Sequence, residues 1–320
     1  MAKIDVTELD IFYISYDEPN CEEHWADLLN KVPWAKRVHG VKGFDKAHKT
    51  AAEQSETDRF ITVDGDNIVM DDFFEQVLEV PDTDHDGNNI SESIFSWNAK
   101  NILNGLVYGN GGLKCWPTEY TKTIRTHEAA DDGEGMEFCW KLNYIQLNDT
   151  FSEVHQTASP FQAFRAGFRE GVKMSLDQGK RIKPDEFKQK VWWQNYNRLQ
   201  TWCNIGSDVD NGLWAIYGAR LGCKMTVLSD WDTNQISDYD WFKEFFETEK
   251  NKIESDEHLK TLTTELGVQL NEEIQGMMLF DPNDQMSKFF KATFVNPKRW
   301  GAMVTERQIQ DLLEQGLIGQ

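Results

Sequence analysis

The first 63 residues alternate between short β-type runs and longer amphipathic runs, and this alternation restricts the fold more than any other feature of the sequence. Apolar side chains recur at helical spacing in the longer runs, whereas the short runs are rich in β-forming residues. The predicted elements are a strand at 10–16, a helix at 21–32, a strand at 37–41, a helix at 44–56 and a strand at 59–63. This β-α-β-α-β order predicts an α/β fold with a mostly parallel sheet flanked by helices.

The remainder of the chain changes character near its middle. The expected elements are strands and turns over 93–115, a strand at 137–147 and an amphipathic helix at 160–176. From Pro184 onward the apolar spacing is mainly helical. The sequence therefore predicts a sheet-containing region at 1–180 and a mainly helical region at 181–320 that packs on it.

Charge and cysteine content limit the functional classes. The net charge of -21 argues against a uniformly basic nucleic-acid binder, because phosphate neutralisation supplies most of the non-specific affinity of such proteins. The five cysteines include no C-x-x-C pair, which is typical of reduced thiols in a cytosol. No stretch approaches the ~20 apolar residues of a membrane span. We therefore expect a soluble, cytoplasmic protein with no membrane partner.

Two aspartates directly follow the third predicted strand. Asp64 and Asp66 flank Gly65, and α/β sheets bind ligands beyond the carboxyl ends of their strands. Mn²⁺ and Mg²⁺ prefer carboxylate oxygens, and the intervening glycine lets the backbone approach a diphosphate closely. We interpret the pair as a cation site, with a plain turn as the alternative. Other D-x-D triplets, such as those at 82–84, 208–210 and 230–232, lack this strand context.

Five segments resemble the GT-A glycosyltransferases, and more narrowly a group of such enzymes in T-even-like bacteriophages and cyanophages. They are FYISYDEPN (12–20), KVPWAKRVHGVKG (31–43), VDGDN (63–67), YGNGGLK (108–114) and AFRAGFREG (163–171). The resemblance implies a GT-A, Rossmann-like catalytic core at 1–180, a UDP-sugar donor, and Mn²⁺ or Mg²⁺ on Asp64 and Asp66.

Enzymes of this group are thought to transfer arabinose to 5-hydroxymethylcytosine in phage DNA. The resemblance thus implies such DNA as the acceptor, the helical region as a contributor to the acceptor site, and the host-cell cytoplasm as the location. It further assigns three residues to the nucleotide pocket: Tyr16, Asp17 and Lys42. By their chemistry Tyr16 can stack on a pyrimidine, Asp17 can accept a hydrogen bond and Lys42 can bind a phosphate. The alternative for each is an ordinary surface or core residue.

A glycine-rich turn at 108–114 is a second candidate contact with the donor. Gly111 and Gly112 expose backbone amides that could face a sugar or diphosphate, and Lys114 could add positive charge. A hairpin turn would have a similar sequence. The spacing matches neither a P-loop nor a G-x-G-x-x-G loop.

Two arginines and a histidine extend the candidate set. Arg165 and Arg169 stand four residues apart on the predicted helix, where like charges repel unless anions oppose them. The anion is either a diphosphate or DNA phosphate, or carboxylates of this chain. His155 follows the last predicted strand of the core, where many GT-A enzymes provide a third metal ligand. Glu153 is an alternative ligand, and a structural histidine is the ordinary alternative.

Three further patterns each allow two interpretations. Asp208 and Asp210 precede a helical run, so they are either N-caps or a general base for the acceptor hydroxyl. Basic and aromatic residues interleave over 180–202, which suits either a nucleic-acid surface or a helix with its tryptophans packed inward. The loop at 82–93 begins like an EF-hand but has Ser93 at its twelfth position, so we interpret it as an acidic loop.

The leading functional prediction is therefore transfer of a hexose or pentose from a UDP-sugar to 5-hydroxymethylcytosine. One alternative keeps the enzyme class and changes the acceptor to a glycan, lipid or protein. Another is a carbohydrate- or nucleotide-binding protein without turnover. A metal-dependent phosphohydrolase is disfavoured because the sequence has no clustered His and Asp set for two metals.

Overall fold

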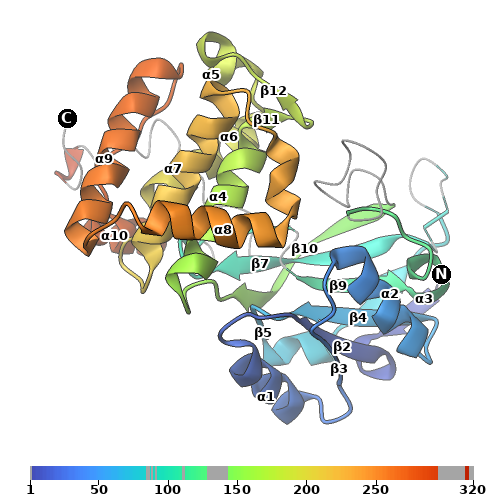
Figure 1. Ribbon diagram of the computed structural model, residues 1–320. Coiled ribbons are helices and arrows are strands. Elements are labelled where there is room, and N and C mark those ends of the chain that lie inside the picture. Colours follow the sequence, from blue (N-terminus) through green and yellow to red (C-terminus); the bar gives the residue numbers. More distant parts are fainter. Residues whose placement is uncertain are drawn as a thin grey trace. The chain divides into compact units, whose positions relative to one another are not determined.

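Figure 1 shows the computed structural model of the chain, which describes residues 2–83, 87, 89–90, 92–109, 112–127, 143–294 and 314–316. The chain divides into two compact units. The sheet unit contains Met1–Lys100 and Val107–His155, and the helical unit contains Asn101–Leu106 and Gln156–Asn296. The boundary between the two units follows His155, so it comes earlier in the sequence than the boundary predicted near residue 180. The helix between these two positions packs on other helices and therefore belongs to the helical unit.

The sheet unit is built on one mixed sheet. Its strands in spatial order are β3 (Lys36–His39), β2 (Asp10–Ser15), β4 (Arg59–Asp64), β9 (Leu113–Pro117), β7 (Ile94–Asn101), β10 (Tyr144–Val154) and β5 (Asn67–Val69), with β8 (Val107–Tyr108) beside β7. A separate antiparallel ribbon joins β1 (Ala2–Asp5) to β6 (Val77–Val80). The β-α-β-α-β prelude is confirmed, with element limits within two residues of those predicted.

The prediction of a mostly parallel sheet is wrong in one respect. β2 runs parallel to β3 and β4, whereas β9 is antiparallel to both β4 and β7, and β5 is antiparallel to β10. Parallel pairing needs long crossovers, usually helical, and within the described residues of this unit the long helices end before β4. The fold is therefore α/β with a mixed sheet.

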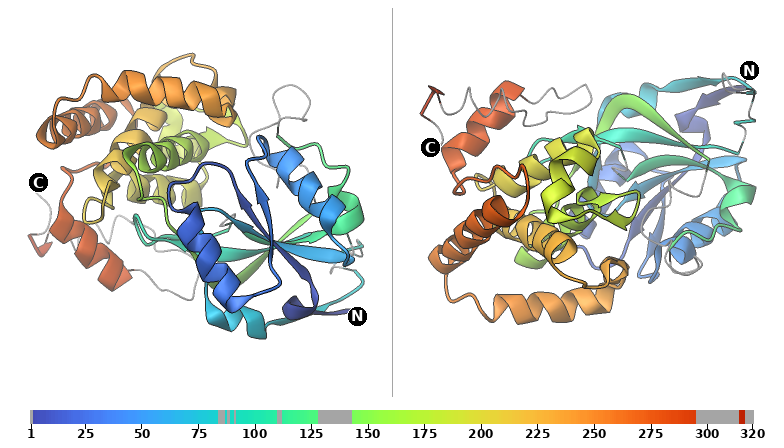
Figure 2. Two further views of the ribbon diagram at one scale, coloured as in Figure 1. Left: turned by 60° about the horizontal axis from the view of Figure 1, so that its bottom comes forward. Right: turned by 90° about the horizontal axis from the view of Figure 1, so that it is seen from above.

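Helices cover both faces of the parallel strands, as Figure 2 shows. They are α1 (Cys21–Lys31) and α2 (Phe44–Gln54). Successive side chains of a strand point to opposite faces, so Ile11 enters the core that contains Leu28 of α1, while Phe12 enters the core that contains Ala51 of α2. Burial on both faces explains why these strands read as nearly continuous apolar runs.

The second unit is mainly helical, as predicted. Its helices are α4 (Pro160–Met174), α5 (Phe187–Lys190), α6 (Trp193–Asn204), α7 (Gly212–Leu228), α8 (Tyr239–Lys250), α9 (Asp256–Glu273) and α10 (Asp284–Phe294), and a hairpin joins β11 (Leu176–Asp177) to β12 (Lys180–Arg181). Among the described helices of both units, none combines the length and apolar character needed to cross a membrane.

Four glycines set the crossing of α4 and α7. A Cβ atom at Gly167 would lie 1.9 Å from the Ala215 carbonyl oxygen, and one at Gly171 would lie 2.2 Å from that of Ala219. Gly218 and Gly222 face the carbonyls of α4 at 2.4 Å in the same way. Since real Cβ atoms do not approach oxygen so closely, the two backbones can meet only because these positions lack side chains.

A buried arginine ties further segments to α7. Arg220 is fully buried, and its guanidinium donates to the carbonyls of Cys203, Thr263 and Phe280 at 2.8, 2.6 and 2.5 Å. Burial lowers the pKa of Arg220 to about 10, so the side chain remains charged at neutral pH. The guanidinium thereby joins α6, α9 and the segment before α10 to one side chain.

The helix crossing can be tested by adding one methyl group. Gly167→Ala should lower the free energy of unfolding by roughly 2–4 kcal/mol, because the new Cβ collides with backbone that cannot move independently. Urea unfolding monitored by circular dichroism measures the change. The exposed Glu265→Ala of α9 serves as the control and should change the value by less than about 0.5 kcal/mol. Equal stability of the two variants would contradict the described crossing.

Candidate metal site at the carboxyl end of β4

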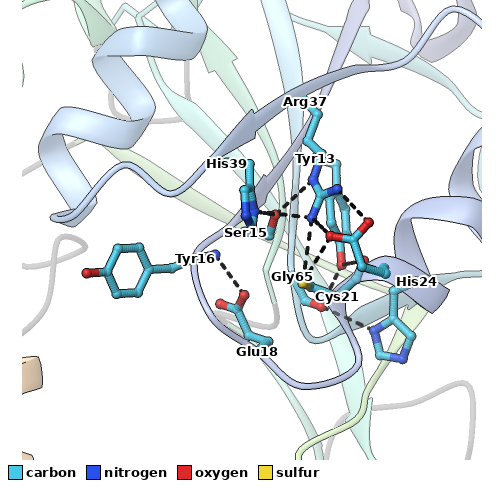
Figure 3. A network of polar contacts seen from close by, with 10 residues as sticks. Tyr13, Ser15, Tyr16, Glu18, Cys21, His24, Arg37, His39 and Gly65 are labelled. Carbon is cyan, nitrogen blue, oxygen red and sulfur yellow. Dashed lines mark hydrogen bonds and ion pairs between the residues drawn. The ribbon is translucent and has the colours of Figure 1, made fainter.

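The Asp64-Gly65-Asp66 turn is held by side chains beneath it. β4 ends at Asp64, and the carbonyl oxygen of Gly65 accepts from the Tyr13 hydroxyl at 2.7 Å and lies 3.2 Å from Nδ1 of His24. Figure 3 shows these contacts. Burial is the main cause that raises the pKa of Tyr13, so its hydroxyl stays protonated at neutral pH. The backbone between the two aspartates is therefore fixed by two buried ring side chains.

Gly112 lies against the first aspartate. Its φ is +87°, and its carbonyl accepts from the Asp64 amide at 3.1 Å. A Cβ atom at this position would lie 2.8 Å from Oδ2 of Asp64 and 2.5 Å from Nδ2 of Asn67. The glycine-rich turn thus meets the D-G-D turn, and Gly112 has both a backbone and a steric reason to be glycine. Gly111 lies outside the described residues.

Lys114 supplies a buried positive charge near the same carboxylate. Its side chain is only 2% exposed, and Nζ stands 4.0 Å from Oδ2 of Asp64, whose side chain keeps 37% of its surface exposed. Burial raises the pKa of Asp64 to about 6, Lys114 opposes the shift, and Asp66 adds to it. The open surface leaves Asp64 available to a ligand, although its surroundings disfavour the charged form.

The pairing of β5 with β10 brings His155 to the second aspartate. Val154 is opposite Asn67 in this ladder, and the His155 amide donates to the Asp66 carbonyl at 2.7 Å. Asn20 also donates to the His155 carbonyl at 3.0 Å. The three predicted metal ligands Asp64, Asp66 and His155 therefore belong to one small region, although they stand up to 91 positions apart in the sequence.

Glu153, the alternative ligand, is already engaged. Its Oε2 lies 3.5 Å from Nε2 of His155, and its Oε1 accepts from Lys100 at 3.2 Å. The contact with His155, followed by the nearby Lys100 charge, lowers the pKa of Glu153 to about 2 against the opposing effect of burial. This carboxylate orients the imidazole, which is how histidine ligands are commonly supported in metal sites.

A cation would have to draw the predicted ligands together. Within the described parts of the chain, the ligand atoms of Cys21, Glu22 and His39 all lie within 4.8 Å of one another. Those of Asp64, Asp66 and His155 do not. Arg37 already binds the trio: it forms two hydrogen bonds to Glu22, at 2.9 and 2.7 Å, and lies 3.6 Å from the Cys21 sulfur and 3.1 Å from His39 (Figure 3). We therefore interpret the trio as an arginine-binding network.

The three residues assigned to the nucleotide pocket follow the ends of parallel strands. Tyr16 and Asp17 follow β2, and Lys42 follows β3. Asp17 and Lys42 are exposed and Tyr16 is partly buried, with its ring directed away from Glu18 and Arg37 in Figure 3. These positions lie at the edge of the sheet where an α/β fold binds ligands.

Sequence reasoning missed Glu18. Its Oε2 accepts from the Tyr16 amide at 2.8 Å and would lie 2.7 Å from a Cβ atom at Gly65. Burial, and then the charges of Asp66 and Asp64, raise the pKa of Glu18. The parallel pairing of β2 with β4 could have indicated this residue, because loops that follow neighbouring parallel strands meet.

The predicted residues of the helical unit have internal partners. Arg165 lies over the rings of Tyr239 and Phe242 at 5.0 and 5.7 Å, and Arg169 donates to the Ile236 carbonyl at 3.3 Å. These contacts place both arginines against α8 and the segment before it.

The N-cap interpretation of Asp208 and Asp210 is wrong. α7 begins at Gly212, and its N-cap residue is Asn211, which has a left-handed φ of 57°. Asp208 is nearly buried and forms an ion pair with Lys291 at 2.8 Å, whereas Asp210 is exposed. Asp208 therefore connects the start of α7 to α10.

The basic and aromatic segment divides its side chains between core and surface. Trp202 is buried, whereas Trp192 and Trp193 are 48% and 57% exposed. Several cations of the segment are used internally: Arg181 donates to backbone carbonyls that include Ser229, and Lys190 pairs with Glu186. Neither the inward-packed helix nor the nucleic-acid surface describes the whole segment.

Two segments that carry predictions are only partly described by the structure. Asp84, His85, Asp86, Asn88 and Ser91 of the EF-hand-like loop lie outside the described residues, as do 128–142, which include the start of the strand predicted at 137–147.

No protein-family model and no curated protein matches the chain.

The pKa of Asp64 predicts how cation binding depends on pH. A cation binds the ionised carboxylate, so its apparent affinity should be nearly constant above about pH 7 and fall roughly tenfold by about pH 5 as Asp64 takes up a proton. Calorimetric titration with MnCl₂ at several pH values measures this effect. Asp64→Asn should bind more weakly and should lose this contribution to the pH dependence. An affinity that stays constant down to about pH 5 would refute the assignment.

Proposed function

We propose that this protein is a metal-dependent glycosyltransferase that uses a nucleotide-sugar donor. The observation that carries the proposal is the placement of Asp64, Asp66 and His155 in one small region at the carboxyl end of β4, at a turn fixed by Tyr13 and His24. Two carboxylates and an imidazole form a donor set that suits Mn²⁺ and also Mg²⁺.

In this mechanism Asp64, Asp66 and His155 would hold the cation, and Glu153 orients His155. When bound, the divalent cation would offset the charge that develops on the leaving nucleoside diphosphate. Lys114 contributes a fixed positive charge to the same region, and the glycine at position 112 leaves room above Asp64. Tyr16 at the end of β2 offers an aromatic face to the base of the donor.

For the acceptor we propose a hydroxymethyl group on modified cytosine in DNA, with a UDP-linked pentose or hexose as the donor. Its support is the resemblance to phage enzymes, together with the exposed Trp192 and Trp193, which offer planar surfaces for bases. A cytosine inside a duplex would have to leave the base stack to react. The ion pair with Lys291 favours a structural role for Asp208.

One observation favours a different acceptor. The chain carries a net charge of -21, and several cations of the segment at 180–202 already have internal partners. A glycan, lipid or protein acceptor would need no long-range attraction to phosphate. The proposed experiment therefore tests the enzyme class and the acceptor separately.

The decisive measurement is release of UDP from a panel of UDP-sugars in Mn²⁺, with and without hydroxymethylcytosine DNA. Asp64→Asn with Asp66→Asn should reduce release at least about a hundredfold, because the leaving group loses its cation. The exposed acids Asp71 and Asp72, both changed to Asn, provide a control with the same change in charge. Release that is stimulated by DNA supports both parts of the proposal, whereas release without stimulation rejects the DNA acceptor. Background release with every donor would reject the transferase.

A further inference from the structure

A thiol, a carboxylate and an imidazole converge beside the first turn of α1. The ligand atoms of Cys21, Glu22 and His39 all lie within 4.8 Å of one another. Two elements supply them, since Cys21 and Glu22 begin α1 and His39 ends β3. Cys21 is buried, whereas Glu22 and His39 are exposed, so the trio has one side against the core and one side open to water. A small ion can therefore reach the trio from solvent.

A single nitrogen of Arg37 marks the centre of the trio. Its Nη2 lies 2.7 Å from Oε1 of Glu22, 3.1 Å from Nδ1 of His39 and 3.6 Å from the Cys21 sulfur (Figure 3). Guanidinium nitrogens only donate hydrogen bonds, so each of the three atoms directs a lone pair toward one point. Sulfur, nitrogen and carboxylate oxygen around one positive charge form a ligand set that proteins use for Zn²⁺.

The backbone that carries the trio is fixed by other contacts. The Tyr13 hydroxyl contacts the Cys21 carbonyl at 2.9 Å, and His39 lies opposite Ser15 in the parallel ladder of β2 and β3. Oγ of Ser15 also lies 2.9 Å from Nδ1 of His39 and orients the ring. The backbone positions of the trio are therefore set by the sheet and the helix, and they do not require the Arg37 headgroup.

We infer that Cys21, Glu22 and His39 form a zinc site at which the metal ion replaces the guanidinium of Arg37. Zn²⁺ binds such ligands at about 2.0–2.3 Å, so the side chains have to close in by roughly 1 Å around the place of Nη2, and water completes the tetrahedron. The Arg37 headgroup then moves into solvent, the Ser15 hydroxyl turns away from Nδ1, and the thiol proton of Cys21 passes to the buffer.

This site goes beyond the proposed function, because it shares no ligand with the D-G-D turn and selects a different kind of ion. A thiolate is a soft ligand that suits Zn²⁺, whereas the carboxylates of Asp64 and Asp66 suit the harder Mn²⁺ and Mg²⁺. Burial raises the pKa of the Cys21 thiol and the Arg37 charge opposes that shift, so the thiol keeps its proton while arginine is bound. Arginine and metal are therefore alternative occupants of one place.

The test measures binding of Zn²⁺, and of Co²⁺ as its coloured substitute, to the reduced full-length protein. Co²⁺ bound to a thiolate absorbs in the near ultraviolet by charge transfer, which identifies sulfur as a ligand. We expect this band in the wild type and in Asp64→Asn with Asp66→Asn, and we expect its loss in Cys21→Ser. The affinity for Zn²⁺, measured by competition with a chromogenic chelator, should fall at least about tenfold in His39→Gln.

Removal of the competing arginine should have the opposite effect. Arg37→Gln should tighten Zn²⁺ binding about tenfold, because the ion no longer has to break charge-assisted hydrogen bonds to Glu22. Lys36→Gln, at the preceding position of β3, is the matched control. It removes the same charge from a side chain that pairs with Asp10, and it should bind Zn²⁺ as the wild type does.

Circular dichroism shows whether each variant is folded. The inference is overturned if Co²⁺ gives no thiolate band in the wild type, if the band persists in folded Cys21→Ser, or if Arg37→Gln binds Zn²⁺ no more tightly than Lys36→Gln. Release of UDP has no part in these measurements, so a protein without transferase activity could still confirm the zinc site.

Discussion

The Gly65 carbonyl is the point on which the arrangement of the sheet unit depends. The chain must stop running parallel to β2 after Asp64 and reverse so that β5 can pair with β10. The Tyr13 hydroxyl comes from β2 and the His24 ring from α1, and both contact this carbonyl from inside the fold. A polar backbone group buried in the turn is thereby satisfied, and the aspartate side chains on either side need not perform that task. Support from the core leaves the carboxylates available for a ligand.

The parallel half of the fold was predictable because its signals are local. Helical spacing between Asn20 and Pro33, and a buried run that ends at Asp64, specify the β-α-β-α-β order without knowledge of distant contacts. The strands after residue 90 pair with partners far away in the sequence. Their alternation alone does not reveal whether a neighbour is parallel, so the mixed character of the sheet was missed.

The same distinction applies to individual residues. The aspartates could be proposed as ligands because they directly follow a buried strand, and His155 because it follows the last strand of the core. Glu18 had no such pattern, since its relation to Gly65 arises only when two loops meet. Asp208 was misread as an N-cap because its partner Lys291 is 83 positions away, while the neighbouring Asn211 adopts the conformation that starts the helix. A capping signal is local, whereas an ion pair between distant helices leaves no pattern in the sequence.

The glycine pairs of α4 and α7 also determine how the two helices can slide. Positions four residues away along the contacting stripes are Ala163 on α4, Ser175 at its C-cap, and Trp214 and Thr226 on α7. A shift by one helical turn, about 5.4 Å, would bring one of these side chains against a backbone that tolerates none. The crossing therefore has a single register. A force along the helix axis would move the two helices together as one rigid body, because neither can slide past the other.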